Sequence, residues 1–123
     1  MHQTRTVLIL AGIMLACVVA LYMGGRWLRR VLERPYSANV QAQLRALVVA
    51  EESYRRDSLS YTSELARVWH PTAETQGVQL RILTASEDAF LAEGHHNGWT
   101  GRCLIALGRA AGDSLPGGEP VCH

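Results

Sequence analysis

The chain has 123 residues, of which 48% are hydrophobic, and carries a net charge of +1 at pH 7. This length is enough for one small domain with a limited hydrophobic core. The charge is divided unevenly, because residues 1–35 contain five arginines and one glutamate (+4), whereas residues 36–123 contain seven arginines and ten acidic residues (−3). Mild negative charge is not typical of a nucleic-acid-binding region, so we expect no nucleic-acid partner.

After a short N-terminal tail, residues 1–6, an uncharged apolar run covers residues 7–25. About nineteen residues at ~1.5 Å per residue form a helix of roughly 28 Å, close to the ~30 Å hydrocarbon thickness of a bilayer. A secretory signal peptide has a shorter apolar stretch of about 7–15 residues and ends at a small-residue cleavage site. The run has no such site and continues past Cys17, where a lipoprotein signal would end. We therefore predict a retained transmembrane helix with a juxtamembrane extension, residues 7–34.

The predicted span has a small-residue face and no polar ligands. It contains no histidine and no charged residue, so we expect it to hold no haem, metal or other cofactor. Gly12, Ala16 and Ala20 recur every four residues and lie on one side of the helix. Small residues let helices approach closely, which predicts a helix-packing face; the alternative is the ordinary abundance of alanine and glycine in spans.

A basic cluster with one aromatic residue follows the span: Arg26, Trp27, Arg29, Arg30 and Arg34. We expect this cluster at the membrane interface, in contact with lipid headgroups or with acidic groups of other integral membrane subunits. Because only Arg5 precedes the span, the positive-inside rule places the C-terminal part in the cytoplasm.

The cysteines favour the opposite orientation. Cys103 and Cys122 both lie in the C-terminal region, and two cysteines in a small domain are typical of a disulfide in an oxidising compartment. Closing a loop of about 20 residues contributes roughly 3 kcal/mol in the chain-entropy model. All twelve basic residues apart from histidine are arginine, a bias typical of GC-rich bacterial genomes. We therefore expect a single-pass protein of the bacterial inner membrane with a periplasmic C-terminal domain, although the arginine count supports the reverse topology.

The residues after the span predict a second helix. Pro35 predicts that the first helix ends or kinks near residues 33–35. Ser37 or Asn39 is placed to cap a helix over residues 38–56. That helix has an apolar stripe at three- and four-residue spacing, formed by Val40, Leu44, Leu47, Val48 and Tyr54.

The remaining residues predict a small antiparallel sheet. A turn at residues 57–60 and a short helical segment at 63–68 precede Pro71. From Val78 the apolar period changes to two, which is typical of strands. We expect a three-stranded meander with the amphipathic helix on one face. Its strands are predicted at 78–83, 89–96 and 102–108, with turns at 86–88 and 97–98 and a loop at 112–120.

A further feature of the C-terminal region is the order in which a set of its residues occurs along the chain. They are Ala42, Leu44, Leu47, Ala50, Glu51, Glu52, Tyr54, Tyr61, Thr62, Leu65, Gly77, Val78, Phe90, His95, Cys103, Pro120, Val121 and Cys122. In this arrangement the region resembles bacterial type IV pilin-like and pseudopilin-like proteins. The resemblance implies a long N-terminal helix packed on a small antiparallel sheet, with the cysteine pair closing the C-terminal loop. We expect an α+β fold, in which a single transmembrane helix precedes a pilin-like extracytoplasmic domain, residues 35–123.

The N-terminus departs from that family. Pilin precursors carry a cleavage motif of Gly, Phe, Thr, Leu, Ile and Glu at the start of the apolar helix, whereas this chain begins Met-His-Gln-Thr-Arg-Thr. The glutamate that neutralises the N-terminus of a neighbouring pilin subunit is missing, and Arg5 and Thr6 stand nearby.

The candidate chemical groups favour a non-enzymatic protein. His95 and His96 are adjacent on a predicted strand and point to opposite faces, so they form a poor metal-binding pair without further ligands such as His70, Glu93 or His123. Glu51 and Glu52 diverge by about 100° on a helix and form no catalytic pair, although Glu51 is placed for a structural hydrogen bond. No nucleophile elbow, phosphate loop or dinucleotide fingerprint is present. Trp69 and Trp99 are assigned to the core or to partner contacts.

Together these features predict a membrane-anchored accessory subunit of a larger inner-membrane complex, such as a photosynthetic or respiratory one. Two alternatives stay open: a minor pilin or pseudopilin of a type IV pilus or type II secretion-like system, and a periplasmic module that binds a small ligand or a metal.

Overall fold

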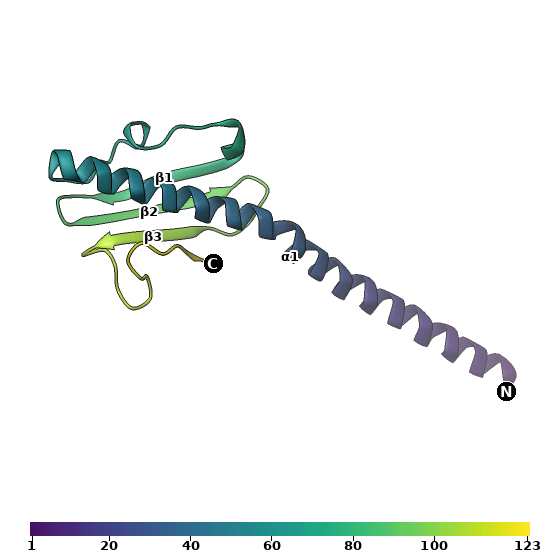
Figure 1. Ribbon diagram of the computed structural model, residues 1–123. Coiled ribbons are helices and arrows are strands. Elements are labelled where there is room, and N and C mark those ends of the chain that lie inside the picture. The colour runs from purple at the N-terminus through teal and green to yellow at the C-terminus, as the bar shows by residue number, and fades with distance from the viewer. The chain divides into compact units, whose positions relative to one another are not determined.

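The protein consists of one long helix followed by a small antiparallel sheet (Figure 1). The computed structural model describes all residues, Met1–His123. The α+β class is confirmed. The elements are α1 (His2–Ser58), the 3-10 turns η1 (Leu65–Arg67) and η2 (Ala73–Thr75), and the strands β1 (Val78–Ala85), β2 (Ala89–His96), β3 (Cys103–Gly108) and β4 (Val121–Cys122).

Helix α1 continues through Pro35, so the helix end predicted near residues 33–35 is wrong. Proline lacks one backbone donor, which costs about 3 kcal/mol inside a helix. The packing of the next turns onto the sheet offsets that cost. Ser37 and Asn39 are therefore interior residues and not caps, and the Asn39 side chain donates a hydrogen bond to the Glu74 carbonyl oxygen at 3.1 Å. The helix ends at Ser58, two residues later than expected.

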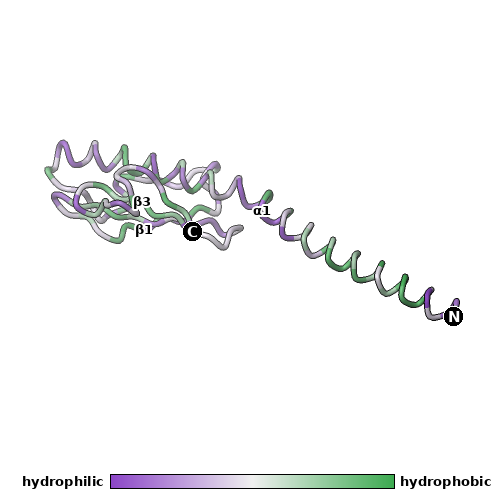
Figure 2. Tube along the Cα trace, turned by 90° about the horizontal axis from the view of Figure 1, so that it is seen from below, coloured by the Kyte–Doolittle hydropathy of each residue, from purple (hydrophilic) through white to green (hydrophobic).

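By its contacts the chain divides into two compact units, Met1–Glu33 and Arg34–His123. The first unit is purely helical, and its apolar side chains, including those of residues 7–25, are exposed (Figure 2). Its most apolar window has a mean hydropathy of 2.6, and none of that window is buried. This stretch is long and apolar enough to cross a bilayer, and by the same criteria it is compatible with a signal sequence.

The second unit contains the sheet, which has the strand order β1-β2-β3-β4 with every neighbouring pair antiparallel. The predicted meander is confirmed, and β2 has the expected bounds. Strand β1 extends two residues further than expected, whereas β3 begins one residue later. The short strand β4 was not predicted, because a two-residue strand gives no periodicity to detect. The helical segment expected at residues 63–68 is reduced to the single 3-10 turn η1.

The core of this unit lies between α1 and one face of the sheet (Figures 1 and 2). From α1 come Val40, Leu44 and Leu47, which are completely buried, as the apolar stripe predicted. The helix and sheet approach closely at Gly94 of β2, where a Cβ atom would lie 2.9 Å from a Val40 methyl carbon. The sheet contributes the inward-facing side chains Val78, Leu80, Phe90, Ala92, Cys103 and Ile105.

Truncation of the stripe tests this packing. Leu44 is fully buried, so Leu44→Ala is expected to lower the free energy of unfolding by about 2–5 kcal/mol. Val49 lies on the same helix but is 70% exposed, so Val49→Ala is expected to change it by less than about 0.5 kcal/mol. Urea unfolding of the full chain in detergent, followed by circular dichroism, measures both values. Equal costs for the two substitutions would contradict the core assignment.

Candidate functional site

The first candidate site is the exposed face of the N-terminal half of α1. Gly12, Ala16 and Ala20 are exposed, and a Cβ atom added at Gly12 would meet no atom within 4 Å. Gly12 and Arg30 are eighteen residues apart, about five helical turns, so Arg30 lies on the same side of the helix as the small-residue face. The small side chains on this side let another helix approach closely, next to a positively charged arginine.

The arginine cluster is free of ion pairs within the chain. Arg26, Arg29, Arg30 and Arg34 form no salt bridge. The Arg26 guanidinium donates a hydrogen bond at 3.4 Å to the Tyr22 hydroxyl and lies 5.7 Å from the centroid of that ring. Trp27 is 67% exposed. Charged groups without internal partners are available to phosphate or carboxylate groups outside the chain.

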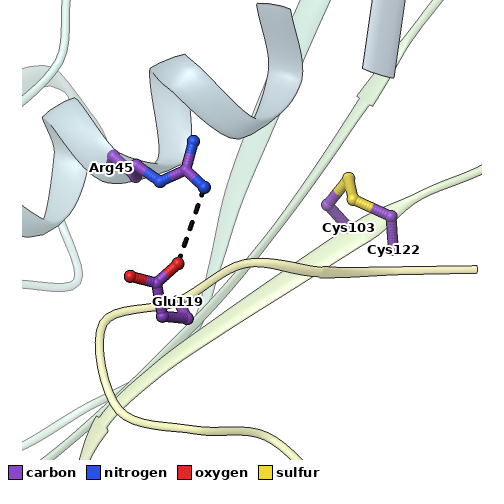
Figure 3. Close-up of a disulfide and its surroundings, with 4 residues drawn as sticks. All are labelled: Arg45, Cys103, Glu119 and Cys122. Carbon is purple, nitrogen blue, oxygen red and sulfur yellow. Dashed lines mark ion pairs between the residues drawn. A yellow bond between two sulfur atoms is a disulfide. The ribbon is translucent and has the colours of Figure 1, made fainter. Parts of the chain in front are cut away.

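Cys103 and Cys122 form a disulfide, as the sequence predicted. The bond joins β3 to β4, directly across the ladder, and thereby fixes the C-terminal segment to the sheet (Figure 3). Figure 3 also shows an ion pair between Arg45 of α1 and Glu119 of the C-terminal loop, in which a guanidinium nitrogen lies 3.5 Å from a carboxylate oxygen. Both groups of this ion pair are largely exposed, so it contributes little compared with the covalent link.

Glu51 is the most unusual polar residue, because its side chain is completely buried at the base of the core. One carboxylate oxygen accepts a hydrogen bond from the Thr62 backbone N–H at 2.9 Å, and the other has no partner. Burial raises the pKa of Glu51, and the Thr62 hydrogen bond opposes that rise. The structural hydrogen bond expected from the sequence is present, whereas complete burial was not foreseen.

The adjacent Glu52 has a different environment. Its carboxylate accepts a hydrogen bond from the Tyr61 hydroxyl at 2.8 Å. Burial of Tyr61, together with the Glu52 carboxylate, raises the pKa of the Tyr61 phenol. The two glutamates thus bind separate groups.

The two adjacent histidines are separated as predicted for a strand. His95 is exposed, whereas the His96 ring stacks on Tyr36 at a centroid distance of 4.3 Å. Atom Nδ1 of His96 accepts a hydrogen bond from the Gly98 N–H at 2.9 Å, and Nε2 lies 3.1 Å from the Gln76 carbonyl oxygen. Both ring nitrogens are therefore engaged by backbone groups. No cluster of three or more metal-ligating side chains is present.

The two tryptophans of the C-terminal unit are both half-buried against the core. Trp69 donates a hydrogen bond from its indole nitrogen to the Gln43 side chain at 3.1 Å. Trp99 packs on Gly101 at the end of the sheet. Neither is a fully exposed contact residue.

Sequence reasoning missed a polar groove on the face of the sheet opposite α1. It has a volume of about 490 Å³, and it is lined by Gln79, Leu80, Arg81, Glu93, Gly94, His95, the segment Trp99–Thr100–Gly101 and Arg102. The signal was available in the alternation of β1 and β2, since these polar residues occupy the positions between buried ones. What the sequence did not provide was the register that places Arg81 opposite Glu93.

Comparison with known proteins leaves the family open: neither protein-family models nor curated protein sequences give a match to this chain.

The buried carboxyl group of Glu51 predicts a pH dependence of stability. Because its pKa is raised in the folded state, the folded protein holds this proton more tightly than the unfolded chain does. The free energy of unfolding should therefore fall as pH rises from the ordinary glutamate value of 4.5 through the raised one. Each unit of pKa difference corresponds to about 1.4 kcal/mol.

Glu51→Gln removes this titration. The free energy of unfolding of the wild type, relative to that of Glu51→Gln, should therefore decrease as pH rises through that window. Glu74→Gln changes an exposed carboxyl group and should leave the pH profile unchanged. Urea titrations between pH 4 and 8 measure the difference. A wild-type profile parallel to that of Glu51→Gln would contradict the raised pKa.

Proposed function

We propose that the protein is a non-enzymatic, membrane-anchored structural subunit that docks into a larger bacterial inner-membrane assembly. The observation that carries this proposal is the exposed apolar stretch of residues 7–25, which continues without a break into the helix that forms the core of the C-terminal unit. An exposed apolar surface of this length requires lipid or other helices to cover it.

A retained span accounts for these features better than a cleaved signal sequence does. Signal peptides end in a small-residue cleavage site, whereas here the helix proceeds through Arg26, Arg29 and Arg30 into the folded unit. In lipid, an isolated segment satisfies its backbone hydrogen bonds only as a helix, so α1 serves as a span without a change of conformation.

The partner-facing side is the one that carries Gly12, Ala16 and Ala20. These side chains leave room for the backbone of a second transmembrane helix, and Arg30, which has no ion pair within the chain, continues the same side. Lipid headgroups or acidic groups of neighbouring subunits neutralise the arginines at the interface.

The disulfide supports a periplasmic location for the C-terminal unit. Disulfides persist in oxidising compartments and are rare in the cytosol. This argument outweighs the arginine count, because the arginines have an alternative role in binding lipid or a partner, whereas the oxidised cysteines require an oxidant.

A minor pilin or pseudopilin is the second candidate, and a specific observation favours it. The uninterrupted helix α1, packed on an antiparallel sheet that the disulfide closes at its C-terminal end, has the architecture expected from the resemblance to type IV pilin-like proteins. The missing cleavage motif and glutamate at the N-terminus count against assembly by the usual pilin route.

Substitutions in the span test the docking face. Ala16→Leu fills the small-residue face and is expected to reduce the recovery of partner subunits by at least ~5-fold, equivalent to about 1 kcal/mol. Val18→Leu enlarges a side chain on another side of the same helix and should leave recovery unchanged. Isolation of the tagged protein in mild detergent, followed by mass spectrometry of co-purifying subunits, measures both.

Equal recovery of partners by the two variants would contradict a docking role for this face. Recovery of copies of this chain alone, with a processed N-terminus, would favour the pilin-like candidate instead.

A further inference from the structure

The groove on the outer face of the sheet has the charge of an anion-binding site. Its central group is Glu93, whose side chain is only 18% exposed and lies between two arginines. The Glu93 carboxylate is 2.7 Å from the nearest Arg81 nitrogen and 3.7 Å from the nearest Arg102 nitrogen. Two arginines and one glutamate leave this cluster with a charge of +1, whereas residues 36–123 together carry a formal charge of −3.

The two arginines are not equivalent. Arg81 approaches Glu93 closely, whereas the Arg102 guanidinium is beyond hydrogen-bond distance and donates no side-chain hydrogen bond within the chain. The Arg102 side chain is 68% exposed and borders the groove. A planar guanidinium with unused donors fits a carboxylate through two parallel hydrogen bonds.

The wall beside Arg102 is apolar and fixed in position. The Trp99 ring packs so closely on Gly101 that a Cβ atom there would lie 2.2 Å from a ring carbon. The backbone of Arg102 forms a reciprocal pair of hydrogen bonds with His123, at 3.2 and 2.9 Å, next to the Cys103–Cys122 disulfide. The backbone that carries the cationic group is therefore held by the ladder that the disulfide closes.

We propose that this groove binds a small monocarboxylate with a flat apolar body, with its carboxylate on Arg102 and its body against Trp99. A volume of about 490 Å³ admits a molecule of that size, and a site charge of +1 matches a single negative charge. A neutral ring compound lacks the partner for Arg102, and acetate lacks the surface for Trp99. The proposal is independent of the partner that the span contacts.

A titration of the full chain in detergent tests the proposal with benzoate as the probe. Two-dimensional NMR follows the indole N–H of Trp99 and the backbone amide of Arg102. Saturable shifts of both signals are expected, with a Kd on the order of 1–10 mM for so small a ligand. Benzamide, which has the same shape without the charge, and acetate, which has the charge without the ring, should each bind at least ~5-fold more weakly.

Two substitutions in the groove and one outside it define the site. Arg102→Gln should weaken benzoate binding by about 10-fold, whereas Arg56→Gln, which removes an exposed arginine of α1 outside the groove, should have no effect. Glu93→Gln raises the charge of the cluster and should strengthen binding by about 5-fold. A gain in affinity cannot result from misfolding, so this variant keeps the test decisive if Arg102→Gln is unstable.

Absence of saturable shifts with benzoate, or equal loss in Arg102→Gln and Arg56→Gln, would overturn the proposal. Acetate or benzamide binding as tightly as benzoate would overturn the two-part recognition. Inorganic phosphate binding more tightly than benzoate would also overturn the proposal, because the site would then recognise a phosphate group and not a carboxylate.

Discussion

The packing of the α1 stripe on the inner face of the sheet is the interaction on which the C-terminal unit depends. Val40, Leu44 and Leu47 are completely buried against residues from all three long strands. A small antiparallel sheet with one apolar face needs another layer to cover that face in water. The sheet therefore packs one face on α1, and its opposite face carries polar groups.

Helix α1 has different surroundings in its N-terminal and C-terminal parts. In the first unit its apolar side chains are uncovered, whereas in the second unit its apolar stripe of Val40, Leu44 and Leu47 is buried. An α-helix satisfies its backbone hydrogen bonds in either environment, so one element can act as a membrane anchor and as the scaffold of a folded domain. We regard this dual use of α1 as the basis of the proposed role as an anchored subunit.

The C-terminal segment is stabilised by different means from the core. Strand β4 has only two residues, so hydrogen bonding alone gives it little stability. The Cys103–Cys122 disulfide and the Arg102–His123 backbone pair hold it against β3. These links also hold the backbone of Arg102 at the groove. The proposed carboxylate site therefore depends in part on the oxidising environment expected from the cysteines.

Periodicity revealed much of this architecture. The apolar stripe of α1, the bounds of β2 and the antiparallel order of the strands were predicted, because a period of 3.6 or 2 is a direct consequence of one-sided burial. Pro35 was misleading about the end of the helix, because the following turns pack on the sheet and keep the helical conformation. The burial of Glu51 and the pairing of Arg81 with Glu93 depend on tertiary register, which local pattern does not determine.

The central claim is that residues 7–25 remain with the folded unit as its membrane anchor. Intact-mass spectrometry of the protein recovered from alkali-washed membranes of the producing cell tests it most directly. The account predicts a membrane-retained chain whose mass includes residues 7–25. Recovery of the C-terminal unit in the soluble fraction, with a mass that lacks those residues, would contradict the claim and identify the apolar stretch as a cleaved signal sequence.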